Sequence, residues 1–159
     1  MKVEIKKISE IAEVKGGKRL PKGMFVIDEP TAHPYLRVVD FTDNGIDRSN
    51  LKYIDEEAFE KTKRYTIHKD DVYISIAGTI GRVGIIPDDL SGSNLTENAA
   101  KITNISSKVD HRYLMYYLRG PVGQGQIVIR TGGTSQPKLA LYRIADINSP
   151  AQFYLYNNV

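Results

Sequence analysis

The sequence contains no cysteine in its 159 residues. This absence excludes a disulfide framework, a thiolate nucleophile and a cysteine-ligated zinc site. It also fits a reducing compartment, so we expect the protein to lie in the cytoplasm. Long hydrophobic runs are missing as well. No stretch approaches the about 20 apolar residues of a membrane span, and the N-terminus mixes acids with lysines rather than opening a secretory signal. We expect a soluble chain with no membrane partner.

Metal and nuclease signatures are also missing. The three histidines, His33, His68 and His111, lie far apart and none belongs to a metal-ligand spacing, so we expect no metal site. A metal-dependent nuclease would place an aspartate upstream of an acid that lies two residues before a lysine. Lys101 lies four residues after Glu97, and Glu13-Val14-Lys15 has the right spacing but no upstream aspartate. These spacings argue against a metal-dependent nuclease centre.

Methyl transfer to a base has no support either. It would require an Asn/Asp-Pro-Pro-aromatic signature, and the sequence has no Pro-Pro dipeptide. The sequence therefore predicts no catalytic residue and no cofactor, and a free-standing nuclease or transferase is the least favoured of the alternatives.

What is present is an ordinary globular composition with a small positive charge. Hydrophobic residues make up 41% and charged residues 26%, which suits a single folded domain. The net charge of +3 favours contact with a polyanion without requiring it.

The hydrophobic pattern predicts both helices and strands. Helices are expected at about 7–14, 55–63 and 110–118, with a further short helix opening at Pro121. Strands are expected at 35–41, 72–77, 82–87 and 94–103, although the alanines of the last segment would also suit a helix. This mixed order predicts an α+β fold: a single compact domain with a twisted mixed or antiparallel sheet and several short helices.

A glycine pair marks the connection between two predicted strands. Gly78-Thr79-Ile80-Gly81 matches the GXXG clamp of KH-type binders of single strands, but that clamp joins two helices. Here it lies between strands, which favours a hairpin turn whose glycines supply positive φ. The tip of such a hairpin can still contact DNA through Thr79, with Arg82 beside it as a donor.

Other candidate binding residues are basic and amide-bearing side chains in turn-rich segments. Arginine, lysine and glutamine contact phosphates and the major-groove edges of guanine and adenine, but the same composition also suits an ordinary solvated surface. With the hairpin tip included, the candidate DNA-binding set is Lys18, Arg19, Lys22, Thr79, Arg82, Arg130, Thr131, Thr134, Ser135, Gln136 and Lys138.

The order of the motifs resembles that of a known family. The segments GGKRLPKG (16–23), DDVYISIAGTIGRVGIIP (70–87), NLTENAAKI (94–102) and GTSQPKLALYRIADI (133–147) are similar to the target recognition domain of type I restriction-modification specificity subunits. The segments 35–47 and 110–127 fit the same order, so the resemblance spans nearly the whole chain.

The resemblance implies a function without a reaction. In that family each such domain is an α/β unit that reads half of a bipartite site in double-stranded DNA, and conserved helices space two of them. Modification subunits bring S-adenosylmethionine and methyl transfer, and restriction subunits bring ATP-driven translocation and cleavage. By resemblance, this chain supplies sequence choice to both kinds of partner and holds no cofactor itself.

The resemblance stops near residue 147. We therefore expect a target recognition domain at 1–147 and a divergent C-terminal tail at 148–159, where the family would lead into a long helix. The alternative hypothesis is a truncated specificity-subunit fragment that acts as a protein-interaction module on modification subunits.

Overall fold

The computed structural model describes residues 3–133 and 135–151. Its five helices are short: α1 (Ile8–Ile11), α2 (Glu56–Thr62), α3 (His111–Arg119), α4 (Pro121–Arg130) and α5 (Leu141–Ala145). Three single 3-10 turns lie at Val38–Asp40, Lys63–Tyr65 and Asp88–Leu90. Among the residues described, no helix is long and apolar enough to cross a membrane.

The strands form two four-stranded sheets and two short ribbons. The first sheet has the order β2 (Glu13–Gly16), β11 (Ala99–Thr103), β8 (Val72–Ser75), β9 (Val83–Ile85), and all its pairs are antiparallel. The second sheet has the order β6 (Lys52–Tyr53), β3 (Pro34–Leu36), β10 (Ser93–Leu95), β7 (Thr66–Ile67), with β3 and β10 parallel. The ribbons pair β1 (Glu4–Lys7) with β12 (Asn148–Ala151) and β4 (Phe41–Thr42) with β5 (Gly45–Ile46).

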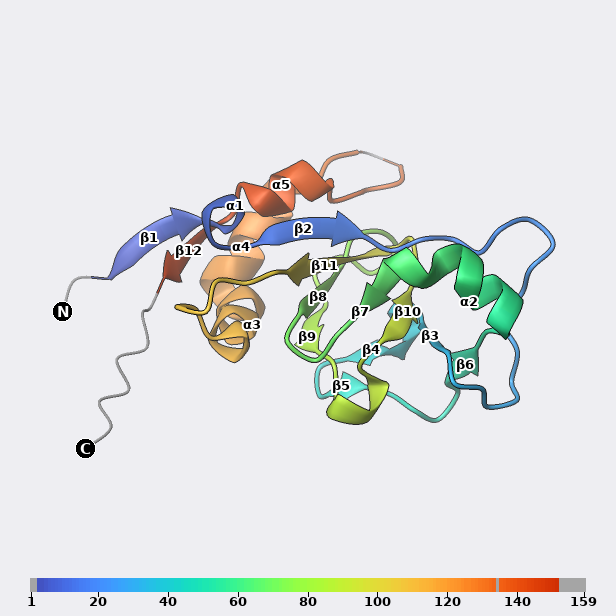
Figure 1. Cartoon of the computed structure of the whole chain (residues 1–159). Coiled ribbons are helices and arrows are strands. Elements are labelled where there is room, and N and C mark those ends of the chain that lie inside the picture. Colours follow the sequence, from blue (N-terminus) through green and yellow to red (C-terminus); the bar gives the residue numbers. More distant parts are fainter. Residues whose placement is uncertain (1–2, 134, 152–159) are drawn as a thin grey trace, which may run out of the picture.

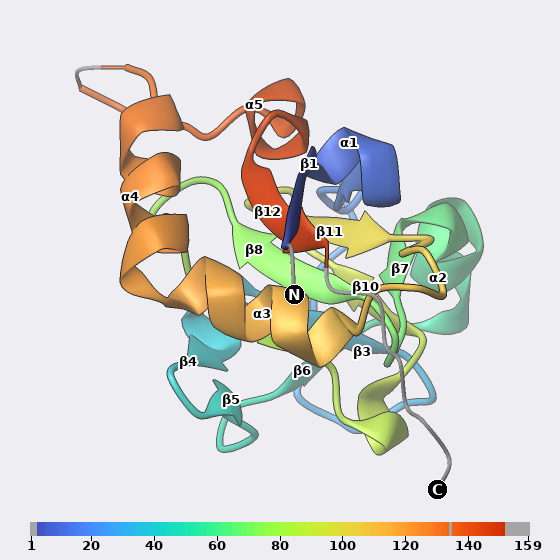
Figure 2. The same cartoon turned by 90° about the vertical axis from the view of Figure 1, so that its left-hand side faces the viewer.

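The two inner strands of the first sheet, β11 and β8, are buried on both faces, which places them at the centre of the molecule. Successive strand residues point to opposite faces. Val72 and Ile74 of β8 accordingly pack with buried side chains of α3 and α4, while Tyr73 between them packs with Leu36 of the second sheet. Figures 1 and 2 show the resulting order, with α3 and α4 to one side of the first sheet and the second sheet with α2 to the other.

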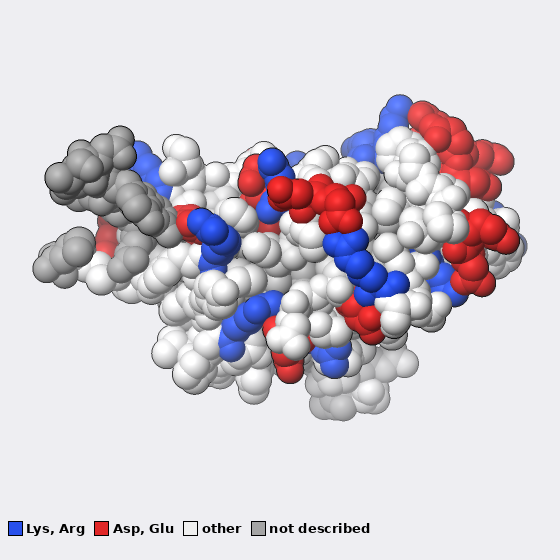
Figure 3. All heavy atoms as spheres, turned by 90° about the horizontal axis from the view of Figure 1, so that it is seen from below, with Lys and Arg blue, Asp and Glu red and all other residues white. Residues whose placement is uncertain are grey.

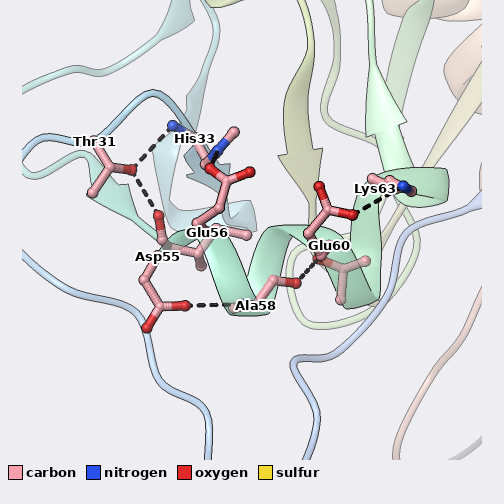
Figure 4. A network of polar contacts seen from close by, with 9 residues as sticks. Thr31, His33, Asp55, Glu56, Ala58, Glu60 and Lys63 are labelled. Carbon is pink, nitrogen blue, oxygen red and sulfur yellow. Dashed lines mark hydrogen bonds and ion pairs between the residues drawn. The ribbon is translucent and has the colours of Figure 1, made fainter.

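Helix α2 begins at a side-chain cap that the sequence predicts. The carboxylate of Asp55 accepts a hydrogen bond from the Ala58 amide at 2.8 Å and satisfies one of the free donors at the helix start. Figure 4 shows this cap beside the pair formed by His33 and Glu56, whose Nε2 and Oε2 atoms are 2.6 Å apart. The His33 ring also stacks on Phe59, with ring centroids 3.8 Å apart. These contacts fix α2 against the loop before β3.

The α+β class predicted from the sequence is confirmed, and so are four local predictions. The segments 72–77 and 82–87 form the hairpin β8–β9, with positive φ at both Gly78 and Gly81. Helices α2 and α3 begin after the predicted aspartate caps, and Pro121 is the first residue of α4.

Three local predictions were right in the type of element and wrong in its extent. The helix expected at 7–14 ends at Ile11, because residues 13–16 pair with β11 and form the edge of the central sheet. The strand expected at 35–41 is interrupted at 38–40, where Asp40 accepts a hydrogen bond from the Arg37 amide at 2.8 Å. The segment 94–103 is two strands, β10 and β11, in different sheets.

The tail predicted at 148–159 begins within a strand. Residues Asn148–Ala151 form β12, which pairs antiparallel with β1 from Glu4↔Ala151 to Lys7↔Asn148. Residues 152–159 lie outside the described residues. The domain boundary at 147 therefore stays a prediction, although four residues beyond it pair with the first strand.

Candidate nucleic-acid interface

Three connecting segments leave the central sheet at the same end. The register pairs Gly16 with Ala100, Ala99 with Ser75, and Ile74 with Val83. The end of β2, the start of β11, the end of β8 and the start of β9 therefore lie side by side. The loop 17–23, the turn 96–98 and the hairpin tip 76–82 must emerge together.

A fourth segment joins them through backbone hydrogen bonds. The Leu139 amide donates to the Ile76 carbonyl at 2.9 Å, and Lys138 forms isolated bridges with Ala77 and Gly132. The loop 132–138 thus folds back beside the hairpin tip, at the upper side of Figure 1. We call the four segments 17–23, 76–82, 96–98 and 132–138 the loop end of the domain.

The loop 17–23 is fixed at its base and exposed beyond it. The Lys18 amide donates to the Leu95 carbonyl at 2.9 Å, and a Cβ on Gly17 would lie 2.0 Å from the Thr96 carbonyl oxygen, so only glycine fits there. The Arg19 side chain is 80% exposed and its Nε lies 2.9 Å from Oε1 of Glu97. Lys22 is exposed in the turn that follows.

The hairpin tip presents one of its two predicted contact residues. Thr79 is exposed, whereas Arg82 is partly buried and donates from Nη1 to the Phe41 carbonyl. The sequence reasoning therefore placed Thr79 at the tip and Arg82 beside it correctly, but Arg82 faces the β4 side of the hairpin.

The loop 132–138 carries polar side chains around a hollow next to the tip. Ser135, Gln136 and Lys138 are exposed. Together with Pro137 and the hairpin residues Ala77 and Gly78, they line a hollow of about 460 Å³. Thr134, the remaining candidate of this loop, lies outside the described residues.

Two other candidates point into the fold. Arg130 is only 17% exposed at its side chain, lies 3.5 Å from the Asp146 carboxylate and donates to the Gln126 carbonyl at 3.3 Å. The Thr131 hydroxyl donates to the Ile127 carbonyl at 2.8 Å. Both side chains therefore stabilise the end of α4 and its junction with α5 and are not part of the exposed group.

The structure adds residues that the sequence reasoning missed. A second open hollow of about 460 Å³ is lined by Arg19, Arg37 and Asn98 together with the exposed apolar side chains of Phe25 and Val39. Arg37 was missed because it lies in a segment predicted as a continuous strand. Asn98 was missed because the turn that separates β10 from β11 was not predicted.

Charge is distributed unevenly over the surface. Figure 3, which views the molecule from below, shows both signs interspersed, with acidic side chains gathered at the right-hand end where α2 lies. The exposed charges of the loop end are mostly basic: Lys18, Arg19, Lys22 and Lys138 against the partly exposed Glu97. Among the described residues, no group of three or more His, Cys, Asp or Glu side chains is placed to hold a metal ion.

Comparison with known proteins decides the family. The family model described as "Type I restriction modification DNA specificity domain" matches residues 1–150. The chain belongs to this family. The specificity-domain family predicted from the motif order is thereby confirmed.

Individual relatives of the specificity-domain family agree. The chain is 31% identical over 93 residues to the type I restriction enzyme EcoBI specificity subunit of Escherichia coli, an alignment covering 58% of this chain and 19% of that subunit. It is similar in fold to the HsdS subunit of Thermoanaerobacter tengcongensis, with a TM-score of 0.69 at 14% identity over 95% of this chain and 33% of that one.

Another solved specificity subunit shares the fold. The type I S subunit of M. genitalium gives a TM-score of 0.59 at 16% identity, covering 93% of this chain and 34% of that one. The chain thus spans about a third of the solved specificity subunits that it resembles.

Proposed function

We propose that this chain reads a short sequence of duplex DNA as one target recognition domain of a type I specificity subunit. The observation that carries the proposal is the loop end, where four segments far apart in sequence meet at one end of the central sheet. Exposed lysine, arginine and glutamine side chains on one irregular surface are the groups that contact phosphates and base edges.

The loop end offers the two kinds of contact that sequence reading needs. Lys18, Lys22 and Lys138 neutralise phosphates and position the domain without selecting a sequence. Arg19 and Gln136 are of the residue types that pair with guanine and adenine in the major groove, which is wide enough for a two-stranded β-ribbon such as the β8–β9 tip. The ion pair of Arg19 with Glu97 faces solvent and is weak, so a guanine edge can replace the carboxylate.

The chain supplies no reaction in this proposal. By analogy with its family, separate modification subunits transfer the methyl group and separate restriction subunits cleave, while this domain selects the site. In this role the chain needs neither a metal ion nor a cofactor.

The test is selection of bound duplexes from a random pool with the purified 159-residue chain. We expect an enriched short motif and an affinity that falls linearly in log–log form as salt rises, since counterion release dominates small basic interfaces. The double variant Lys22→Gln, Lys138→Gln should bind more weakly with a smaller salt slope. An affinity independent of salt, or a pool without enrichment, would contradict the proposal.

A second candidate function is docking on a modification subunit, and one observation favours it. Helix α4 exposes three large apolar side chains: Val122, Val128 and Ile129 are 63%, 71% and 79% exposed. Large apolar side chains exposed together on one short helix are a feature of interaction surfaces.

Co-purification with the modification subunit in the absence of DNA tests this second function. The double variant Val128→Lys, Ile129→Lys should lose the subunit, while Ile5→Lys on β1, which is 59% exposed in the wild type, should retain it. Retention by both variants would exclude α4 as the docking surface.

A further inference from the structure

Four arginines are partly buried, and they divide into two kinds. Arg37 and Arg130 each have a carboxylate partner: Arg37 lies 3.0 Å from Asp40, and Arg130 lies 3.5 Å from Asp146. Arg82 and Arg119 have no carboxylate within 4.0 Å among the described residues. Partial burial of a cation costs free energy, because the charge loses part of its hydration shell. Here no carboxylate compensates for that loss.

The two unpaired arginines line the same cavity. It has a volume of about 460 Å³ and lies between the hairpin, the β4–β5 turn and the α3–α4 junction. Figure 2 shows β4 and β5 directly below the junction of α3 and α4. Arg82 comes from the hairpin and Arg119 from the last residue of α3, so two elements far apart in sequence bring like charges to one hollow. We call it the arginine cavity.

Each guanidinium is held in place by one backbone carbonyl. Arg119 donates from Nε to the Val83 carbonyl at 2.6 Å, and Arg82 donates from Nη1 to the Phe41 carbonyl. These are the bonds that the two side chains donate to backbone carbonyls within the described part of the chain, and Arg119 also interacts with the Tyr73 hydroxyl, so further N–H donors of each guanidinium remain for a ligand. Two fixed forks around one hollow suit a phosphate, which accepts paired hydrogen bonds from arginine.

The remaining lining residues do not neutralise the two arginines. The Gln124 amide is already committed, donating to the carbonyls of Gly81 at 3.0 Å and Leu118 at 2.8 Å, and so stiffens the wall. Asp43, the single acid of the lining, is exposed and lies beyond 4.0 Å from both guanidiniums.

The pKa of a buried tyrosine nearby is affected by the positive charge of both arginines. The hydroxyl of Tyr73 is fully buried beside Arg119. Burial raises the pKa of Tyr73, while the charge of Arg119, the contact of its guanidinium with the hydroxyl and the charge of Arg82 oppose that rise. Both cations therefore act on one region of the interior.

We propose that the arginine cavity binds one backbone phosphate of the DNA duplex, beside the groove that the hairpin tip enters. The inference rests on the proposed function, and it names a phosphate-binding residue, Arg119, outside the loop end. The hairpin connects the two sites: Thr79 is exposed at its tip, while Ile80, Gly81 and Arg82 directly after it line the cavity. A duplex that receives the tip in a groove brings a bordering phosphate to this position.

The first test asks whether the cavity binds an anion at all, with inorganic phosphate as the probe. Titration of the full chain, followed by amide chemical shifts in a ¹H–¹⁵N spectrum, should give saturable shifts at Gly81, Arg82 and Gln124. Arg119→Gln should abolish them, and Arg112→Gln at the other end of α3, 67% exposed in the wild type, should leave them unchanged. No saturable shift at these amides, or equal shifts in Arg119→Gln, would overturn the anion site.

The second test asks whether the occupant is a DNA phosphate. One phosphate contact contributes about 0.9 to the slope of log affinity against log salt. Arg119→Gln should therefore reduce the slope for duplex binding by about 1, equally for every sequence, while Arg119→Lys and Arg112→Gln should keep it. Melting temperatures of all variants show whether Arg119→Gln still folds without its hydrogen bond to the Val83 carbonyl. If it does not fold, Arg119→Lys provides a variant that keeps the positive charge but lacks the guanidinium.

The two tests separate the possible failures. Phosphate shifts with an unchanged slope in Arg119→Gln would mean that the cavity takes free phosphate only, which overturns the DNA occupant. A wild-type chain that binds no duplex would overturn both the proposed function and the DNA occupant, while the phosphate titration would still decide whether the anion site exists.

Discussion

Arg19 and Glu97 join two segments of the loop end across 78 positions of sequence, with Nε and Oε1 at 2.9 Å. Glu97 also accepts a hydrogen bond from the Thr96 hydroxyl at 2.9 Å. The pair connects the loop after β2 to the turn before β11. It therefore holds the Arg19 side chain beside Glu97 while no DNA is bound.

This pair predicts a pH dependence. Partial burial raises the pKa of Glu97, but hydrogen bonds from Arg19, its own backbone and Thr96 outweigh burial and leave the pKa below its ordinary value of 4.5. Ionised Glu97 therefore stabilises the fold fully above pH 4.5, and this contribution is lost as the pH falls through the lowered pKa. Melting temperatures of wild type and Glu97→Gln should differ slightly at neutral pH and converge in acid. A difference that stays constant across this range would contradict the assignment.

Contacts to phosphates and to bases predict different mutational signatures. Lys138→Gln should weaken duplex binding to all sequences alike and lower the salt slope by about 1. Gln136→Ala should leave the slope nearly unchanged and relax the preference at one base pair, by about 1–3 kcal/mol. Binding to a panel of duplexes with single base-pair changes, at several salt concentrations, measures both. Lys61→Gln on α2 is the control. If it lowered the salt slope as much as Lys138→Gln, the change could not be assigned to a phosphate contact at the loop end.

The glycines of the hairpin tip should differ in how much they tolerate a side chain. Both have left-handed backbones, at φ +73 for Gly78 and φ +89 for Gly81. A Cβ on Gly78 meets nothing within 4 Å, so Gly78→Ala should cost about 1–2 kcal/mol from backbone strain alone. At Gly81 the Cβ would also lie 3.2 Å from Oε1 of Gln124, so Gly81→Ala should cost more. Urea unfolding gives both values, and the reverse order would show that the tip relaxes.

The cap of α2 offers a test of stability away from the loop end. Asp55→Ala removes the acceptor of the Ala58 amide and should lower the free energy of unfolding by about 1 kcal/mol. Asp55→Asn retains an acceptor and should lose less. Glu57→Ala, on the exposed side of the same first turn, should be nearly neutral, and a loss equal to that of Asp55→Ala would assign the effect to helix charge rather than to the cap.

Local signals in the sequence predicted the hairpin and the capped helices because those elements are defined by neighbouring residues. Asp55 and Asp110 cap the turns that follow them, and Gly78 and Gly81 supply the backbone angles of the tip between them. The residues 13–16 form a strand for a different reason, since their partner is β11, more than 80 positions away. No pattern within 7–14 records that pairing.

The candidate site shows the same division. Lys18, Arg19, Lys22, Gln136 and Lys138 were recognised by type in turn-rich segments, and the structure places them at one end of the sheet. Composition did not show that Arg130 lies against Asp146, nor that Arg119 and Arg82 share a cavity. Such distinctions depend on which elements pack together, and only the tertiary structure supplies that.

The pairing of β1 with β12 affects how the domain can be joined to a longer polypeptide. Glu4 lies opposite Ala151, so the first and last strands of the described chain lie side by side at one end of the molecule (Figure 1). A domain whose two ends lie close together can be inserted into a longer polypeptide with little distortion of the surrounding structure. Exchange of the whole domain between longer polypeptides would then transfer the proposed DNA specificity in a single step.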